Sequence, residues 1–158
     1  MNTSTVFLAL VAAVLLILPA CGSDRAVSTQ IPTAEPISLA VEDAGEPWGE
    51  KFFTGLSGRE SVEGGMLFDF EETVTVGFQM RKTLVPLSIA FVSETGIIVD
   101  IKNMAPLSED SYVSARPYRY AIEVNQGYFA KHGIGVGDLV EVERADSEDF
   151  AIVVFHRS

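Results

Sequence analysis

One basic pair in the sequence has residue types that suit the binding of an anion. Arg81 and Lys82 are adjacent in a chain with 11 basic and 22 acidic side chains, and Thr83 follows them. Arginine presents a planar fork to carboxylate or phosphate, lysine adds a compact charge, and threonine adds a hydroxyl. This pattern predicts a pocket for a carboxylated or phosphorylated ligand. The alternative is that both cations pair with acidic side chains on neighbouring strands, a solvated arrangement worth about 0 to 1 kcal/mol.

Three further polar residues are secondary candidates for the same pocket. Arg116 precedes an expected strand, and Glu123 and Asn125 flank apolar Val124 near the end of that strand. Because side chains alternate along a strand, the pattern predicts that both polar residues point outward, so they are alternatively ordinary residues of a sheet face. If the chain is instead an enzyme, Glu123 or Asp100 is the expected proton-transfer group.

Other catalytic and metal-binding patterns are incomplete. Residues 55–59 (GLSGR) lack the second glycine of a nucleophile elbow, and neither histidine has a second imidazole or thiolate at ligand spacing. The acidic residues within 69–72 lack the alternating ligands of a calcium loop, which favours a solvated acidic turn. The glycines within 133–137 precede a strand-like stretch, so we interpret them as turn glycines and not as a phosphate cradle. No metal ion or cofactor is expected.

The only cysteine, Cys21, directly follows an apolar run of fifteen residues from Val6 to Ala20. A bilayer-spanning helix takes about 20 residues, so this run is short for a span but suits an export signal. The tetrapeptide Leu-Pro-Ala-Cys resembles the lipobox of bacterial lipoproteins, in which the cysteine is lipidated. We predict a signal peptide over 1–20, a flexible tether over 21–36, and attachment to the cell membrane or outer membrane, outside the cytoplasm. The alternative is an uncleaved anchor, or an ordinary signal peptide that leaves a free thiol.

Charge and hydropathy describe the remainder as one acidic domain over 37–158. The net charge of −11 argues against a nucleic-acid surface, which requires clustered Lys and Arg. Alternation over 74–80, with Val74, Val76, Phe78 and Met80 inward, predicts a half-buried strand, and the runs at 89–92 and 97–101 predict a hairpin. Further strands are expected at 120–124, 139–142 and 150–155, with short helices at 58–63 and 127–132. The domain is therefore predicted to be mostly β.

Three aromatic residues, Trp48, Phe52 and Phe53, precede these strands. We expect them to pack against the sheet, because large aromatic side chains are usually buried for most of their surface. The alternative is an exposed aromatic surface.

Three stretches have a more specific pattern: GMLFDF at 65–70, MRKTLVPLSIAF at 80–91 and YAIEVNQGYFAKHGIGVGDLV at 120–140. In this order and spacing they resemble the bacterial and archaeal domain of unknown function 192 family, over about residues 52–142. The resemblance implies an α+β, mostly β domain with a twisted, barrel-like antiparallel or mixed sheet and one or two short helices, without an established activity. The sequence departs from the family at Gln79, Lys82 and Ser88, where Trp, Asn and Asp are typical. The loss of Asn and Asp puts an inherited activity in doubt.

Two functions remain compatible with these patterns. The first is a lipid-anchored binding or accessory module that holds a small anionic ligand or a partner protein at the cell envelope. The alternative is an envelope hydrolase or transferase that uses a carboxylate general acid or base. The first is favoured, because the sequence has no nucleophile and base, and no paired acids, at recognisable spacing.

Overall fold

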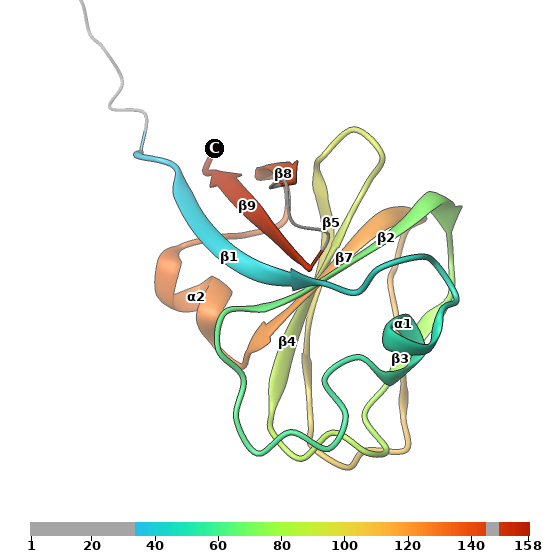
Figure 1. The fold of residues 1–158 in the computed structure, drawn as a ribbon. Coiled ribbons are helices and arrows are strands. Elements are labelled where there is room, and N and C mark those ends of the chain that lie inside the picture. Colours follow the sequence, from blue (N-terminus) through green and yellow to red (C-terminus); the bar gives the residue numbers. More distant parts are fainter. Residues whose placement is uncertain (1–33, 145–148) are drawn as a thin grey trace, which may run out of the picture. The chain divides into compact units, whose positions relative to one another are not determined.

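A seven-stranded mixed sheet forms the centre of the domain (Figure 1). The computed structural model describes residues 34–144 and 149–158. The signal segment, Cys21, the tether up to residue 33 and most of the acidic stretch before the last strand therefore lie outside the described residues. In sheet order the strands are β5 (Ile98–Met104), β4 (Leu87–Val92), β7 (Tyr118–Asn125), β2 (Gly65–Val74), β1 (Ile37–Asp43), β9 (Phe150–His156) and β8 (Leu139–Arg144).

Two smaller units complete the domain. The strands β3 (Gly77–Gln79) and β6 (Ser111–Val113) form a separate two-stranded ribbon, and the helices α1 (Glu50–Thr54) and α2 (Tyr128–His132) are one turn each. The two helices lie on different sides of the sheet (Figure 1). Among the described residues no helix has the length and apolar character that a membrane span requires.

The sheet curls until its two edge strands, β5 and β8, meet at one corner. All neighbouring strands pair antiparallel except β1 and β2, which pair parallel. At the corner, Val140 N donates to Gly96 O at 2.7 Å and Ile98 N donates to Asp138 O at 3.0 Å. A side chain at position 96 would place its Cβ 2.7 Å from Val140 O, and the φ of Gly96 is +81°, so only glycine fits. The result is a half-barrel.

Apolar side chains cover both faces of the central strands β2, β4 and β7. On β2, Met66 and Phe68 point to one face and Leu67 points to the other. We name these two faces the α1 core and the α2 core after the helix that packs on each. Burial of a large apolar side chain contributes about 1.5–3 kcal/mol, so the two cores together hold the sheet in its curled form.

The structure confirms the mostly β fold class and most of the predicted elements. The hairpin is β4 and β5, the three later strands are β7, β8 and β9, and the helix expected at 127–132 is α2. Gly133 and Gly137 have positive φ, and Asp138 Oδ2 accepts from Gly135 N at 2.8 Å, as expected of a glycine turn.

Two predicted elements are wrong. The single strand over 74–80 is broken, because β2 ends at Val74 and the chain turns before Gly77, which leaves Val76 exposed. The turn lets β3 fold over the α1 core, where Phe78 contacts Phe68 and Phe91 edge to face. The predicted helix at 58–63 is a non-helical loop in which Gly58 has a φ of +73°, and the helix on this side of the sheet is α1.

Candidate functional site

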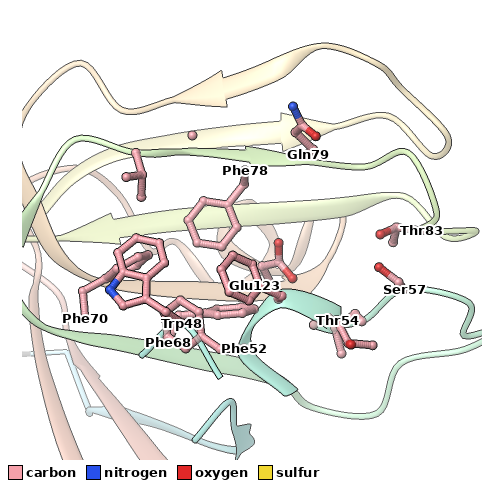
Figure 2. A pocket seen from close by; sticks show the side chains of 15 residues that line it. Trp48, Phe52, Thr54, Ser57, Phe68, Phe70, Phe78, Gln79, Thr83 and Glu123 are labelled. Carbon is pink, nitrogen blue, oxygen red and sulfur yellow. The ribbon is translucent and has the colours of Figure 1, made fainter. Parts of the chain in front are cut away.

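A cavity of about 300 Å³ lies between α1, β3 and the central strands (Figure 2). We name it the α1 cavity. Its apolar walls include five aromatic residues: Trp48, Phe52, Phe68, Phe70 and Phe78. Its polar side chains are Thr54, Ser57, Gln79, Thr83 and Glu123. A cavity of this size, with aromatic walls and several polar groups, has the character of a small-molecule site.

The aromatic walls explain why a helix of one turn is stable at this position. An isolated helix as short as α1 does not form in water, so its stability must come from packing. Phe52 of α1 is buried and meets Phe68 at 5.2 Å and Phe70 at 4.9 Å between ring centroids, both nearly perpendicular. Such pairs contribute about 0.5–1.5 kcal/mol beyond burial. Phe52 therefore packs against the sheet as expected, whereas Trp48 is half-exposed and Phe53 is mostly exposed.

Among the described residues, Glu123 is the one ionisable side chain that lines the α1 cavity. It lies on the central strand β7, where Met66 of β2 and Ile89 of β4 are its paired residues. Only 5 % of its surface is exposed, and it makes no hydrogen bond or ion pair with any described residue. Burial disfavours the carboxylate and raises the pKa of Glu123 to about 8, so the side chain is mostly a neutral acid at pH 7. The expectation that Glu123 points outward is wrong, because β7 is covered on both faces.

Two hydroxyls share the cavity with this carboxyl. Thr83 is buried, and its backbone oxygen accepts from Leu107 N at 3.0 Å, which holds the loop that carries it. Ser57 lies just after α1, and its backbone N donates to Thr54 O at 3.1 Å. Figure 2 shows the oxygen atoms of both side chains turned toward the part of the cavity where the Glu123 carboxyl lies. The three side chains together offer several hydrogen-bonding atoms to one bound group.

The other predicted site residues lie outside the α1 cavity. Arg81 and Lys82 are exposed on a turn, and neither forms an ion pair with a described residue, so the expected cross-strand pairing is not found there. Arg116 is exposed in the loop before β7. Asn125 donates from Nδ2 to Val62 O at 2.7 Å and secures a loop at the end of β7. Of the six candidates, the structure brings Thr83 and Glu123 together, and ligand binding by the rest stays a prediction.

Asp100, the second candidate for proton transfer, is held as a carboxylate. Partial burial raises the pKa of Asp100. Hydrogen bonds from Ala115 N at 2.9 Å and from Lys102 outweigh burial, so the net pKa lies below the usual value. It does not line the α1 cavity. Its environment suits the anchoring of the loop before β7 better than proton transfer at neutral pH.

The acidic stretch 69–72 divides into one buried and two exposed residues. Asp69 is 4 % exposed, and it accepts from Arg119 Nε at 3.1 Å, from an Arg144 guanidinium N–H at 2.8 Å and from Glu71 N at 2.8 Å. Burial acts to raise its pKa, yet these donors outweigh burial and lower it. The solvated acidic turn is therefore wrong for Asp69. Glu71 and Glu72 are exposed as expected.

Glu71 and Glu72 border a second, shallower hollow that adjoins the α1 cavity. Its lining also includes Glu46, and the two hollows share Trp48 and Phe70. Trp48 and Glu71 both have positive φ, 65° and 59°, a conformation that costs a side-chain-bearing residue roughly 1–3 kcal/mol. No group of three or more His, Cys, Asp or Glu among the described residues could hold a metal ion.

Comparison with known proteins gives a family but no activity. Residues 30–142 match the profile of DUF192, described as "Uncharacterized ACR". The chain belongs to this family. No curated protein matches it.

Two crystal structures resemble this DUF192 chain in fold and sequence. One is a candidate transcription regulator from Sinorhizobium meliloti, 30% identical with a TM-score of 0.59, covering 66% of this chain and 93% of that one. The other is a protein of unknown function from Novosphingobium aromaticivorans, 29% identical with a TM-score of 0.60, covering 66% and 82%.

The three departures from the DUF192 pattern have different places in the structure. Gln79 lines the α1 cavity, and Lys82 lies on the exposed turn that follows Gln79 in the chain. Ser88 is buried on β4, where Oγ donates to Asn103 Oδ1 at 2.7 Å and accepts from Gly127 N at 3.1 Å. Ser88 therefore fixes the turn into α2, whereas Gln79 contributes its amide group to the lining of the cavity.

Proposed function

We propose that this DUF192 protein is a lipid-anchored envelope protein whose domain binds a small ligand in the α1 cavity. The observation that carries the proposal is the buried carboxyl of Glu123, which faces the cavity without a partner among the described residues. The carboxyl oxygens are open to the cavity and free of hydrogen bonds to described residues, so a ligand in the cavity can supply a hydrogen-bond partner.

A cavity-blocking variant tests this proposal. A compound screen by thermal shift is expected to find at least one compound that raises the melting temperature, because a ligand that binds only the native state stabilises it. Ser57→Trp, which places a large side chain in the cavity, should abolish the shift. Glu109→Gln, at an exposed position, is the matched control. A shift that is equal in Ser57→Trp and in the unsubstituted protein would place the ligand elsewhere.

The proposed anchor rests on the sequence around Cys21, and lipid would supply the membrane contact. Two or more acyl chains attach a protein stably, whereas one is marginal. Growth with an alkyne-labelled fatty acid should label the chain, and Cys21→Ser should lose the label and leave the membrane fraction. Label that persists in Cys21→Ser would contradict lipidation at this residue.

The exposed turn with Arg81 and Lys82 keeps its proposed role in binding an anionic ligand or a partner protein. Both cations are free of ion pairs among the described residues, and the turn lies between cavity residues Gln79 and Thr83 in the chain. Double substitution with Ala should weaken binding of an anionic ligand. Unchanged affinity would remove the turn from the site.

The pKa of Glu123 favours a second candidate, an envelope hydrolase or transferase. A group that is protonated at neutral pH inside a cavity meets the requirement for a general acid, and such a residue is a common mark of an active site. A screen of envelope esters, amides and glycosides should then show turnover that falls by about 10² to 10⁴ in Glu123→Gln. Turnover that is equal in the variant would exclude Glu123 as the acid.

Transcription regulation, the role in the name of the Sinorhizobium protein, is a less suitable function for this chain. A DNA surface needs clustered Lys and Arg, and this chain has a net charge of −11.

A further inference from the structure

The α1 cavity is acidic at its floor and beside its mouth. Glu123 lies inside, and the adjoining hollow adds Glu46, Glu71 and Glu72. Among the described residues, no Lys, Arg or His lines either hollow. An acidic surface alone would be a solvated face, but here it adjoins a buried carboxyl that has no partner in the described part of the chain.

We propose that the ligand of the α1 cavity is an organic cation, a primary ammonium group on an aliphatic stem, with its nitrogen against Glu123. This inference rests on the proposed function of the cavity. An ammonium group has three N–H donors, and the cavity offers Glu123, Ser57 and Thr83 as acceptors. The stem packs among the aromatic rings, whose faces also attract a cation.

The position of Glu123 lets binding be coupled to a proton. The residues that face it are apolar or hydroxylic: Met66 from β2, Ile89 from β4, Phe52 from α1, and Ser57 and Thr83 from the loops. The ionisable residues of α1, Glu50 and Lys51, are exposed and do not line the cavity. Within residues 34–144 and 149–158, Glu123 is therefore the one cavity group that titrates. When an ammonium group binds near neutral pH, the neutral acid releases its proton to solvent and the carboxylate pairs with the cation.

The proton gives each class of ligand a different pH dependence. Binding of a cation strengthens as pH rises through the pKa of Glu123, because the carboxylate becomes available. Binding of an anion weakens over the same range, because the neutral acid loses the proton that it could donate. A neutral alcohol changes little. The sign of the dependence therefore identifies the charge of the ligand even while its chemical structure is unknown.

Three compounds with one stem provide the test: n-hexylammonium, 1-hexanol and hexanoate. The full chain in a non-ionic detergent is titrated with each at pH 6 and pH 8.5, and the fluorescence of Trp48 is followed. Trp48 is the only tryptophan in the sequence and it lines the cavity, so its emission reports on the site. We expect hexylammonium to bind at least tenfold more tightly at pH 8.5 than at pH 6, and at least tenfold more tightly than hexanol at pH 8.5.

Two variants and one further probe separate charge from packing. Glu123→Gln should lower the affinity for hexylammonium at pH 8.5 at least tenfold and remove its pH dependence, whereas Glu109→Gln should change neither. If the stem lies as proposed, the second ammonium of 1,6-diaminohexane extends toward the adjoining acidic hollow, so this probe should bind about three- to tenfold more tightly than hexylammonium. That gain should disappear in the double variant Glu71→Gln with Glu72→Gln.

The outcomes distinguish this inference from the proposed function. If hexanol or hexanoate binds the unsubstituted protein at pH 8.5 as tightly as hexylammonium does, the ligand is not a cation, yet the cavity still binds small molecules. If hexylammonium binds Glu123→Gln as tightly as it binds the unsubstituted protein, the assigned contact is wrong. If none of the four probes gives a saturable change in Trp48 emission, both this inference and the proposed binding function are overturned.

Discussion

Asp69 and Glu123 are buried carboxyl groups on neighbouring strands, but they differ in their hydrogen-bond partners and in the direction of their pKa shifts. Asp69 on β2 receives hydrogen bonds from two arginines and a backbone N–H, and its pKa is lowered. Glu123 on β7 receives none from described residues, and its pKa is raised to about 8. Their exposed fractions are almost the same, 4 % and 5 %, so burial alone does not separate them.

The difference lies in what each carboxyl faces. Asp69 joins β2 to the far end of the sheet, because Arg144 of β8 bridges it to Asp43 of β1, at 2.8 and 3.3 Å. Glu123 faces a cavity, and no hydrogen bond or ion pair among the described residues uses its carboxyl. A buried carboxyl with protein partners thus acts in stability, whereas one that faces a cavity is available to a ligand.

The largest expected effect is a loss of stability with rising pH that comes from Glu123. Its pKa in the folded state exceeds the unfolded value, so the folded protein binds more protons and the free energy of unfolding falls between about pH 4.5 and 8. The slope is about 1.4 kcal/mol per pH unit, roughly 4 kcal/mol in all. Urea unfolding at pH 5, 6.5 and 8 measures it. Glu123→Gln should flatten the slope, and an equal slope in that variant would contradict the comparison.

Removing the charge of Asp69 is expected to have the next largest effect. Asp69→Asn leaves Arg119 without its carboxylate and leaves Arg144 with Asp43 alone, and breaking a buried pair in this way costs about 3–5 kcal/mol. Because both arginines are partly exposed, we expect less than that range, about 2–3 kcal/mol. Urea unfolding at pH 6 checks the value. A change below about 0.5 kcal/mol would show that Asp69 and Glu123 do not differ in structural role.

Removing one arginine should have a smaller effect with a distinctive pH signature. Arg144→Met leaves Arg119 as a partner of Asp69, and the lost pair is half-exposed, so we expect a cost of about 1 kcal/mol. The pKa of Asp69 should rise toward its usual value. The ionised Asp69 stabilises the folded state, and this contribution is lost as pH falls through the folded-state pKa of Asp69. Because that pKa is higher in the variant, acid unfolding should begin at a higher pH than in the unsubstituted protein. An unchanged acid transition would mean that Arg119 and Glu71 N suffice.

The smallest expected effect is on the exposed turn. Arg81→Ala with Lys82→Ala should change the free energy of unfolding by less than about 0.5 kcal/mol, because both side chains are exposed and form no ion pair with described residues. Thermal unfolding of the double variant measures this. A larger loss would show that the turn supports the α1 cavity directly, as Asp69 supports the sheet.

The strands could be predicted from local patterns of apolar residues, whereas the site could not be predicted in this way. Local runs such as 89–92 and 97–101 fix a hairpin, because their pairing depends on neighbouring residues. Whether Glu123 points to solvent or into a core depends on α1 and β3, which come from distant parts of the chain. One signal was available: all of 65–70 is apolar except Gly65 and Asp69, which is typical of a strand covered on both faces. Since β7 pairs with that strand, its polar residues were also candidates for burial.

The basic pair shows the opposite limitation. Arg81, Lys82 and Thr83 are contiguous, so residue type alone suggests a joint role. The turn separates them, because Thr83 N donates to Met80 O at 3.0 Å and directs Thr83 inward while the two cations stay outside. Residue type thus identified a polar segment correctly but could not say which member reaches the cavity.

The pairing of β1 with β9, from Ile37 with Phe155 to Glu42 with Phe150, sets the order in which the domain can be completed. The first strand of the domain cannot find its main partner until the last strand has emerged from the ribosome. Such pairing between distant residues slows folding, because the entropy of closing a long loop is lost before the contacts form. If the chain is exported as proposed, this delay keeps the domain unfolded and ready for translocation until β9 has been synthesised. Loss of residues 149–158 would leave β1 and β8 without their shared partner, so truncated chains should be recognised by proteases as incomplete.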